Sequence, residues 1–116
     1  MKRISTLAAV LTAAAVAAGG ASARVPTLKG TVTDAFKITL TRGGKRVKTL
    51  KPGTYRIVVK DPTSIHNFHL FGPHVNKKTS VAGKGTKTWV VRLRKGTYRY
   101  VCDPHKAIMK GSFRVT

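Results

Sequence analysis

The feature that most constrains this chain is a series of short segments in which apolar and polar residues alternate. In one of them, Phe36, Ile38 and Leu40 are separated by lysine and threonine, which is the period of two typical of a half-buried β-strand. Turn residues such as Gly43-Gly44 end these segments at intervals of roughly eight to twelve residues. The pattern predicts an all-β chain that folds as an antiparallel sandwich or barrel. The expected strands cover residues 36–42, 45–50, 54–60, 64–71, 86–94, 97–102 and 111–116.

The first 23 residues have a different character. Lys2 and Arg3 precede an apolar run that is too short to span a bilayer comfortably, and Ala21-Ser22-Ala23 matches an A-x-A cleavage signal. We therefore expect residues 1–23 to be a cleavable secretory signal peptide, with an uncleaved membrane anchor as the alternative. The remaining residues 24–116 have room for a single domain. Such a protein would be exported, either to a periplasm or to the outer face of a cell envelope.

The chain is strongly basic. It has 23 lysines and arginines against Asp34, Asp61 and Asp103, a formal net charge of +20, or +18 without Lys2 and Arg3. A charge of this size favours an anionic partner, which we expect to be an acidic redox protein or another anionic surface. Export and the absence of a nucleic-acid motif argue against nucleic acid. We expect the protein to be a monomer.

Rare residues gather in one loop between two expected strands. Cys102 is the only cysteine, Met109 is the only methionine besides the initiator, and His105 lies between them. A lone cysteine in an exported protein cannot form an internal disulfide, which leaves it a buried apolar residue, an intermolecular disulfide, a nucleophile or a metal ligand. Its neighbours favour the last of these, because a thiolate with two imidazoles and a weak axial thioether is the ligand set of a copper site. Zinc would more often recruit further cysteines or carboxylates.

Such a copper site needs a second histidine from elsewhere in the chain. On the expected strand 64–71, alternation puts His66 on the same face as the apolar Phe68 and Leu70, while His69 faces the other way. This predicts His66 as the remote ligand, with His69 as the fallback. His69 and His74 are otherwise expected to be solvent-exposed imidazoles that could bind a second metal weakly.

These motifs together resemble one family. His66-Asn67, followed by YRYVCDPH at 98–105 and MKGSF at 109–113, is similar to the plastocyanin–amicyanin group of cupredoxins, the type 1 blue copper proteins. The resemblance implies a single-domain Greek-key β-sandwich or barrel that holds one copper ion, Cu(I) or Cu(II), and carries single electrons. It also implies the roles of the ligands: His66, Cys102 and His105 equatorial, and Met109 axial.

The same resemblance implies what surrounds the ligands. Asn67 would tie the two ligand loops together through the region of Asp103, next to Pro104. His105 would reach the surface through an apolar patch and serve as the electron port. The spacing C-x2-H-x3-M lies between those of plastocyanin and amicyanin. By the resemblance, the patch around His105 comprises Pro104, Ala107 and Ile108, and it is flanked by Lys106 and Lys110.

Three other functions compete with the electron carrier. A copper chaperone would use the same soft ligands, but it would more typically have an open, Met-rich or multi-Cys site. An enzyme is not expected, because no orienting third group or oxyanion motif accompanies Cys102 and His105. A metal-free binding module would have no need of a complete four-residue ligand set.

Overall fold

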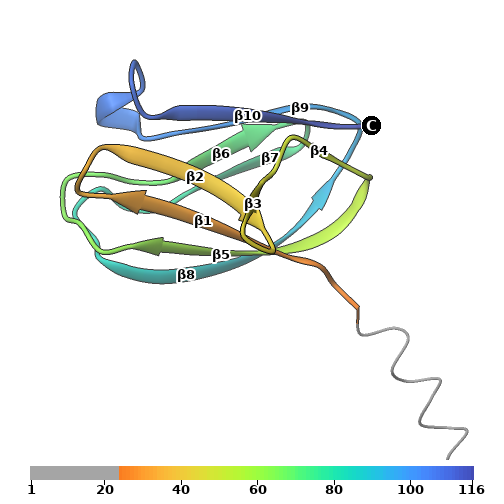
Figure 1. The fold of residues 1–116 in the computed structure, drawn as a ribbon, viewed down its shortest axis with the longest axis horizontal. Helices are drawn as coiled ribbons and strands as arrows, with labels where there is room; N and C mark the ends of the chain where they lie inside the picture. The colour runs from red at the N-terminus through yellow and green to blue at the C-terminus, as the bar shows by residue number, and fades with distance from the viewer. Residues whose placement is uncertain (1–23) are drawn as a thin grey trace, which may run out of the picture.

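The computed structural model describes residues 24–116, which fold into a β-sandwich of two five-stranded sheets (Figure 1). This confirms the predicted fold class. The expected signal peptide, residues 1–23, lies outside the described residues. In the first sheet the strand order is β3 (Lys45–Arg46), β2 (Lys37–Arg42), β1 (Thr27–Thr33), β5 (Gly53–Asp61) and β8 (Gly85–Leu93). In the second it is β4 (Thr49–Leu50), β10 (Lys110–Val115), β9 (Gly96–Val101), β6 (His69–Gly72) and β7 (Val75–Lys78), with one short 3-10 helix, η1 (Asp103–His105).

The sheets are mixed rather than purely antiparallel, which corrects the expectation. Strand β1 pairs parallel to β5, and β4 pairs parallel to β10. The expected strand 45–50 is in fact two short strands in different sheets, because the chain crosses from one layer to the other between them. Strand β1 was not expected from alternation because Gly30 stands where an apolar residue would show the pattern. A Cβ atom at Gly30 would lie 2.9 Å from the Phe68 ring, so only glycine fits there.

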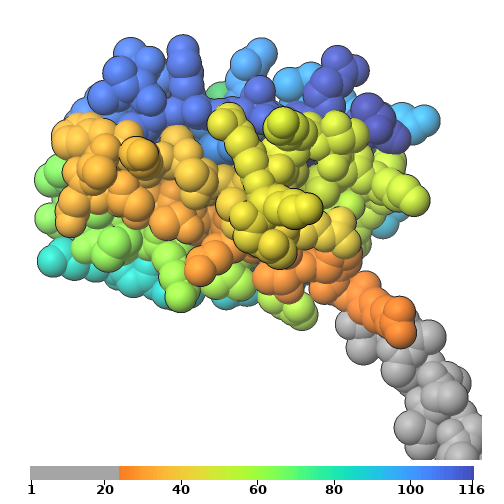
Figure 2. All heavy atoms as spheres, viewed as in Figure 1, coloured from red at the N-terminus to blue at the C-terminus, as the bar shows by residue number. Residues whose placement is uncertain are grey.

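Aromatic rings fill much of the space between the sheets. Phe68 stacks on Tyr100 with ring centroids 5.5 Å apart, and Tyr98 stacks on Phe113 at 5.4 Å. All four rings are almost completely buried. Offset-stacked pairs of this kind add about 0.5–1.5 kcal/mol beyond the burial of their area. Figure 2 shows that side chains close the gap that the ribbon leaves between the two layers.

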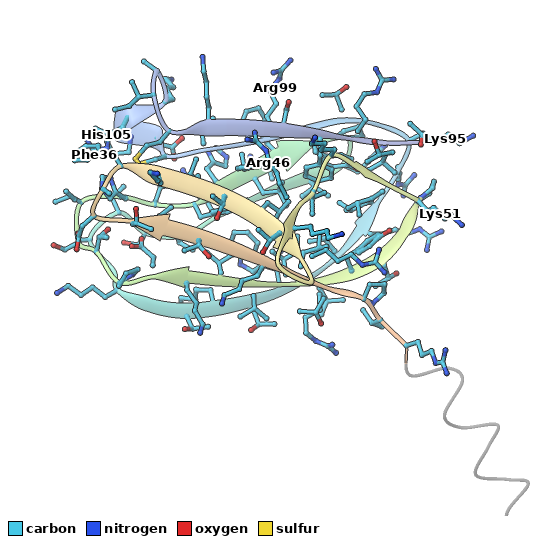
Figure 3. The ribbon with its side chains drawn as sticks, in the orientation of Figure 1. Phe36, Arg46, Lys51, Lys95, Arg99 and His105 are labelled. Carbon is cyan, nitrogen blue, oxygen red and sulfur yellow. The ribbon has the colours of Figure 1, made fainter. Side chains whose placement is uncertain are left out.

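The connections at one end of the sandwich bring together segments that are distant in sequence. The β1–β2 turn, the segment between β5 and β6, and the segment between β9 and β10 all lie at this end. Figure 3 shows Phe36 and His105 there, whereas Lys51 and Lys95 lie at the opposite end. No helix in residues 24–116 is both long and apolar enough to cross a membrane.

Candidate metal centre

Cys102, His105 and Met109 lie on a tightly closed hairpin between β9 and β10. The Cys102 amide donates to the Met109 carbonyl at 3.0 Å, and the amides of His105 and Met109 donate to the carbonyls of Cys102 and His105 at 3.0 and 2.8 Å. Pro104 lies at the start of η1, where its fixed φ favours the first turn of a helix. Within this loop Cys102 and Met109 are completely buried, and His105 is partly exposed.

His66 reaches the same place from the segment between β5 and β6. The expected strand 64–71 begins only at His69, so His66 is not turned inward by strand alternation. A side-chain relay holds it instead: the carboxylate of Asp61 accepts hydrogen bonds from the amide and hydroxyl of Thr63, and that hydroxyl accepts one from the amide of His66 at 3.2 Å. His66 is completely buried, and so is its neighbour Asn67, which alternation would have turned outward.

Three electron-rich atoms converge in the space between these segments. The Nδ1 atoms of His66 and His105 lie 3.1 Å apart, and the Cys102 Sγ lies 3.7 and 3.5 Å from them. A first-row metal ion takes imidazole nitrogen at about 2.0 Å and thiolate sulfur at about 2.3 Å, so two ligand atoms of one ion lie less than about 4.3 Å apart. All three separations meet that condition. The Nε2 of His66 is buried without a hydrogen-bond partner in the described chain, and the atom of His66 that converges with the other two is Nδ1.

The axial position has a candidate of the right chemistry. Met109 is completely buried, and its backbone is hydrogen-bonded to both Cys102 and His105. A thioether is a soft and weak ligand, suited to copper more than to calcium, magnesium or manganese. The donor set of two imidazoles, a thiolate and a thioether therefore fits copper, and no carboxylate joins the three converging atoms.

Phe36 is part of the site, although alternation assigned it to a strand. It lies in the turn before β2 with a left-handed φ of 59°, an uncommon conformation for a bulky residue. Its ring meets both imidazoles edge to face, with centroids 4.7 Å from His66 and 4.9 Å from His105. It is 41% exposed, so it covers the histidine pair from the solvent side. Backbone strain of this kind is concentrated at functional sites, but no sequence signal marks it.

We expect Phe36→Ala to open the site to small ligands. Azide should bind the Cu(II) protein about tenfold more tightly, because the apolar cover over the histidine pair is lost. Phe36→Gly should open it equally but should be about 1 kcal/mol more stable than Phe36→Ala, because glycine adopts a positive φ without strain. Optical azide titrations and urea unfolding measure both effects. Unchanged azide affinity in both variants would mean that Phe36 does not shield the site.

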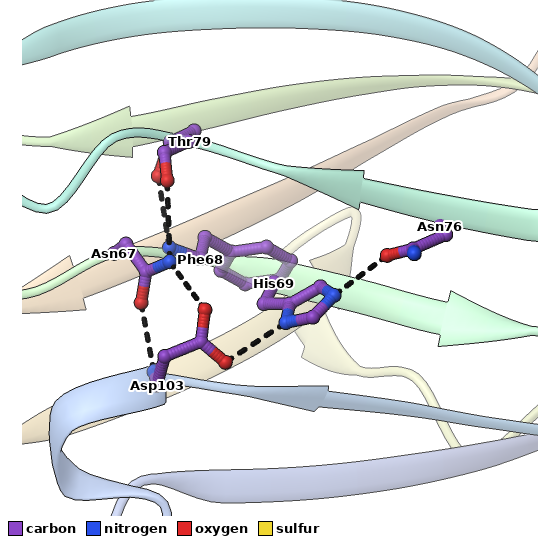
Figure 4. Close-up of polar contacts among 6 residues, drawn as sticks. All are labelled: Asn67, Phe68, His69, Asn76, Thr79 and Asp103. Atoms are coloured by element: carbon purple, nitrogen blue, oxygen red, sulfur yellow. Dashed lines mark hydrogen bonds and ion pairs between the residues drawn. The ribbon is translucent and has the colours of Figure 1, made fainter.

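A polar network ties the two ligand segments together (Figure 4). Asn67 accepts a hydrogen bond from the Asp103 amide at 2.8 Å and donates to the Asp103 carboxylate at 2.9 Å and to the Thr79 carbonyl at 3.2 Å. This is the link between Asn67 and Asp103 that the resemblance implied. His69 extends the network, with Nδ1 2.8 Å from the Asp103 carboxylate and Nε2 2.7 Å from the Asn76 side-chain oxygen. The expectation of a solvent-exposed His69 was wrong, whereas His74 is exposed.

Ionisation of Asp103 couples this network to pH. Burial opposes ionisation, but hydrogen bonds from His69 and Asn67 and the charges of His69 and Lys78 outweigh it and lower the pKa of Asp103 from 3.8. The folded state thus favours the ionised form of Asp103. The contribution of this carboxylate to the free energy of unfolding is fully present above the unfolded-state pKa, and it is lost as the pH falls through the lower folded-state pKa. Urea unfolding of the metal-free protein should therefore show a loss of stability below about pH 4.

Asp103→Asn should flatten this acid dependence, since its side chain no longer titrates. Asp34→Asn is the matched control, because Asp34 is an exposed carboxylate in the turn next to Phe36 and should leave the dependence in place. An equal flattening in both variants would assign the acid sensitivity to total charge rather than to the network.

Comparison with known proteins decides the family. A sequence profile described as copper binding proteins of the plastocyanin/azurin family matches residues 49–116. The chain belongs to this family of copper-binding proteins. Those residues contain the histidine pair, Cys102 and Met109, and the predicted resemblance is confirmed. The cofactor is copper, and His66, Cys102, His105 and Met109 are positioned to bind one ion.

Solved structures of rusticyanin and amicyanin are similar to this chain, and the match to reduced rusticyanin supports the fold. Reduced rusticyanin is similar with a TM-score of 0.54 and 21% identity over 78% of each chain. Rusticyanin from Thiobacillus ferrooxidans gives 0.49 and 23%, covering 78% of this chain and 76% of that one. A mutant amicyanin in its Cu(I) form gives 0.48 and 20%, covering 83% and 88%. No match was found among curated protein sequences.

Proposed function

We propose that this plastocyanin/azurin-family protein is a type 1 copper electron carrier, with His66, Cys102 and His105 as equatorial ligands and Met109 as the axial ligand. The observation that carries the proposal is the convergence of two imidazole nitrogens and one thiol sulfur within 4.8 Å of one another. Copper held by such a set exchanges single electrons between its +1 and +2 states. The protein would be a carrier and not an enzyme.

The residues around the site would make this electron exchange fast because they hold the ligands in fixed positions. The closed hairpin holds three ligands, and the Asn67–Asp103 bridge fixes the hairpin against the segment that carries His66. Ligands fixed in this way need little rearrangement when the charge of the ion changes. Cys102 is buried and the Phe36 ring covers the histidines, so water is kept from the site. The exclusion of water tunes the reduction potential of the copper.

His105 is the ligand that reaches toward solvent, and we propose it as the electron port. It is partly exposed, unlike His66, and Ile108 beside it on the hairpin is 66% exposed. Pro104 and Ala107 are also exposed, so an apolar surface surrounds this ligand. Phe36 and Ile65, 41% and 48% exposed, add apolar area to the same end. Lys106 and Lys110 would supply a positive rim.

We further propose export and an anionic partner. The signal-like residues 1–23 support export to a periplasm or the outer face of the cell envelope. The charge of +18 outside that segment supports an acidic redox protein, or another anionic surface, as the partner. The protein would work as a monomer.

Voltammetry tests the carrier against the main alternative, an extracytoplasmic copper chaperone. A carrier should give a reversible one-electron couple on a carboxylate-terminated electrode, and the current should fall as ionic strength rises, because salt screens the positive protein from the negative surface. Tight Cu(I) binding without reversible cycling would support the chaperone instead. A current that does not respond to salt would show that the net charge does not guide docking.

A further inference from the structure

A pocket of about 350 Å³ lies beside the ligand hairpin, on the seam between the two sheets. Strands β9 and β10 line one side of it, with Arg99 and Val101 on the former and Lys110 and Ser112 on the latter. Arg46, from β3 of the other sheet, completes the lining together with Gly111. Three cationic side chains from three strands therefore surround one hollow.

The register brings two of these cations to the same face. Ser112 is directly opposite Arg99, and Lys110 is directly opposite Val101, so Arg99 and Lys110 are diagonal neighbours. Diagonal neighbours lie about 7–8 Å apart, a distance that long side chains span easily. Both side chains can therefore contact one small ligand, and the hydroxyl of Ser112 lies next to them.

Arg46 lies beside a buried group at the pocket. Its guanidinium lies beside the Tyr100 hydroxyl, where its charge opposes the rise that burial causes in the pKa of Tyr100. Tyr100 is almost completely buried and its ring packs over Gly111, so the position of the hydroxyl is fixed by the core. One of the three cations thus lies next to a buried hydroxyl at the edge of the pocket.

Nothing in the described chain neutralises these charges. The single ion pair among residues 24–116 joins His69 to Asp103, and no carboxylate lines the pocket. Three cations beside one another repel, and an anion between them relieves that repulsion. Guanidinium groups suit the planar, bidentate recognition of phosphate oxygens, and a lysine adds a point charge.

We propose that this pocket binds a phosphate group through Arg46, Arg99 and Lys110. A tetrahedral phosphate group, with several acceptor oxygens and at least one negative charge, matches three cations and a hydroxyl better than a planar carboxylate does. The group is either free phosphate or the phosphate of an anionic lipid headgroup. Because Lys110 follows Met109 and Val101 precedes Cys102, a bound anion lies close to both ends of the ligand hairpin. It would lower the reduction potential of the copper, an effect that rests on the proposed function, whereas the binding itself does not.

The binding is tested by titrating inorganic phosphate into the full chain, with and without copper, at constant ionic strength. Amide resonances followed by NMR should shift at residues 99, 101 and 110–112 and saturate at one phosphate per chain. Arg99→Gln should weaken binding at least about tenfold, the effect of losing one charge-assisted hydrogen bond. Phosphatidylglycerol vesicles form a second arm: Arg99-dependent vesicle binding that phosphate competes away assigns the group to a lipid, and phosphate binding alone assigns it to the free anion.

Arg56→Gln is the matched control. Arg56 is an exposed arginine on β5 of the other sheet that does not line this pocket, and its replacement makes the same change in net charge. It should leave phosphate affinity nearly unchanged. Binding that does not saturate, or that both variants weaken equally, would overturn the proposal and leave only diffuse attraction. In the copper-loaded protein, phosphate should lower the potential less in Arg99→Gln than in the native chain.

Discussion

Cys102→Ser should yield a folded protein that no longer turns intensely blue or green when Cu(II) is added. The colour of a type 1 site comes from charge transfer between thiolate sulfur and copper, and a serine hydroxyl is neither soft nor ionised at neutral pH. The side chains are nearly equal in size, so the buried position keeps its packing. Burying a hydroxyl without a full set of partners should cost about 1–3 kcal/mol of unfolding free energy. Absorption spectra and urea unfolding measure the two effects.

His74→Ala is the control for the colour. His74 is an exposed imidazole away from the converging atoms, so its loss should leave the spectrum unchanged. If the colour survives Cys102→Ser, the sulfur is not the donor and the type 1 assignment fails.

Asn67→Ala should lower the melting temperature of the metal-free protein by at least about 10 °C. The side chain makes three hydrogen bonds: two join it to Asp103 on the other ligand segment, and one goes to the Thr79 carbonyl. Buried groups that lose such partners cost about 1–3 kcal/mol each, and one kcal/mol moves the melting temperature of a domain this small by about 4–8 °C. Thermal unfolding followed by circular dichroism measures the change.

Asn76→Ala removes the same side chain from an exposed position, where it bonds only to His69. The melting temperature should then fall by no more than a few degrees. A small effect in Asn67→Ala as well would mean that the bridge between the segments contributes little, and the ligands would have to be held by the hairpin and the core alone.

Residue chemistry and local spacing predicted most of the site. The cluster of Cys102, His105 and Met109 is short enough to lie on one loop in almost any β-fold, so these residues could be named as candidate ligands without coordinates. His66 was chosen for a reason that proved wrong, since it precedes the strand rather than alternating within it. Of the two candidates, His66 is nonetheless the buried one. The apolar Phe68 and Leu70, which suggested the alternation, pack this segment into the core.

What depends on the third dimension could not be predicted in this way. Phe36 alternates correctly with Ile38 and Leu40, and only its positive φ takes it out of the strand and over the histidines. Strand β1 was missed because its central inward-facing residue is Gly30, where the Phe68 ring occupies the space of a side chain. The parallel strand pairs were missed because alternation indicates which face of a strand is buried, but not which strand it pairs with or in which direction.

The distance of 36 residues between His66 and Cys102 governs when the protein can acquire its metal. In an unfolded chain Cys102, His105 and Met109 are near one another in sequence, so they can meet copper together before the sandwich exists, whereas His66 is far from them. Bringing His66 to Cys102 requires β6 to pair with β9, which is a slow, non-local step in folding. Copper added during refolding would meet a reactive thiol without its remote partner, so the productive order is to fold first and to load the metal afterwards.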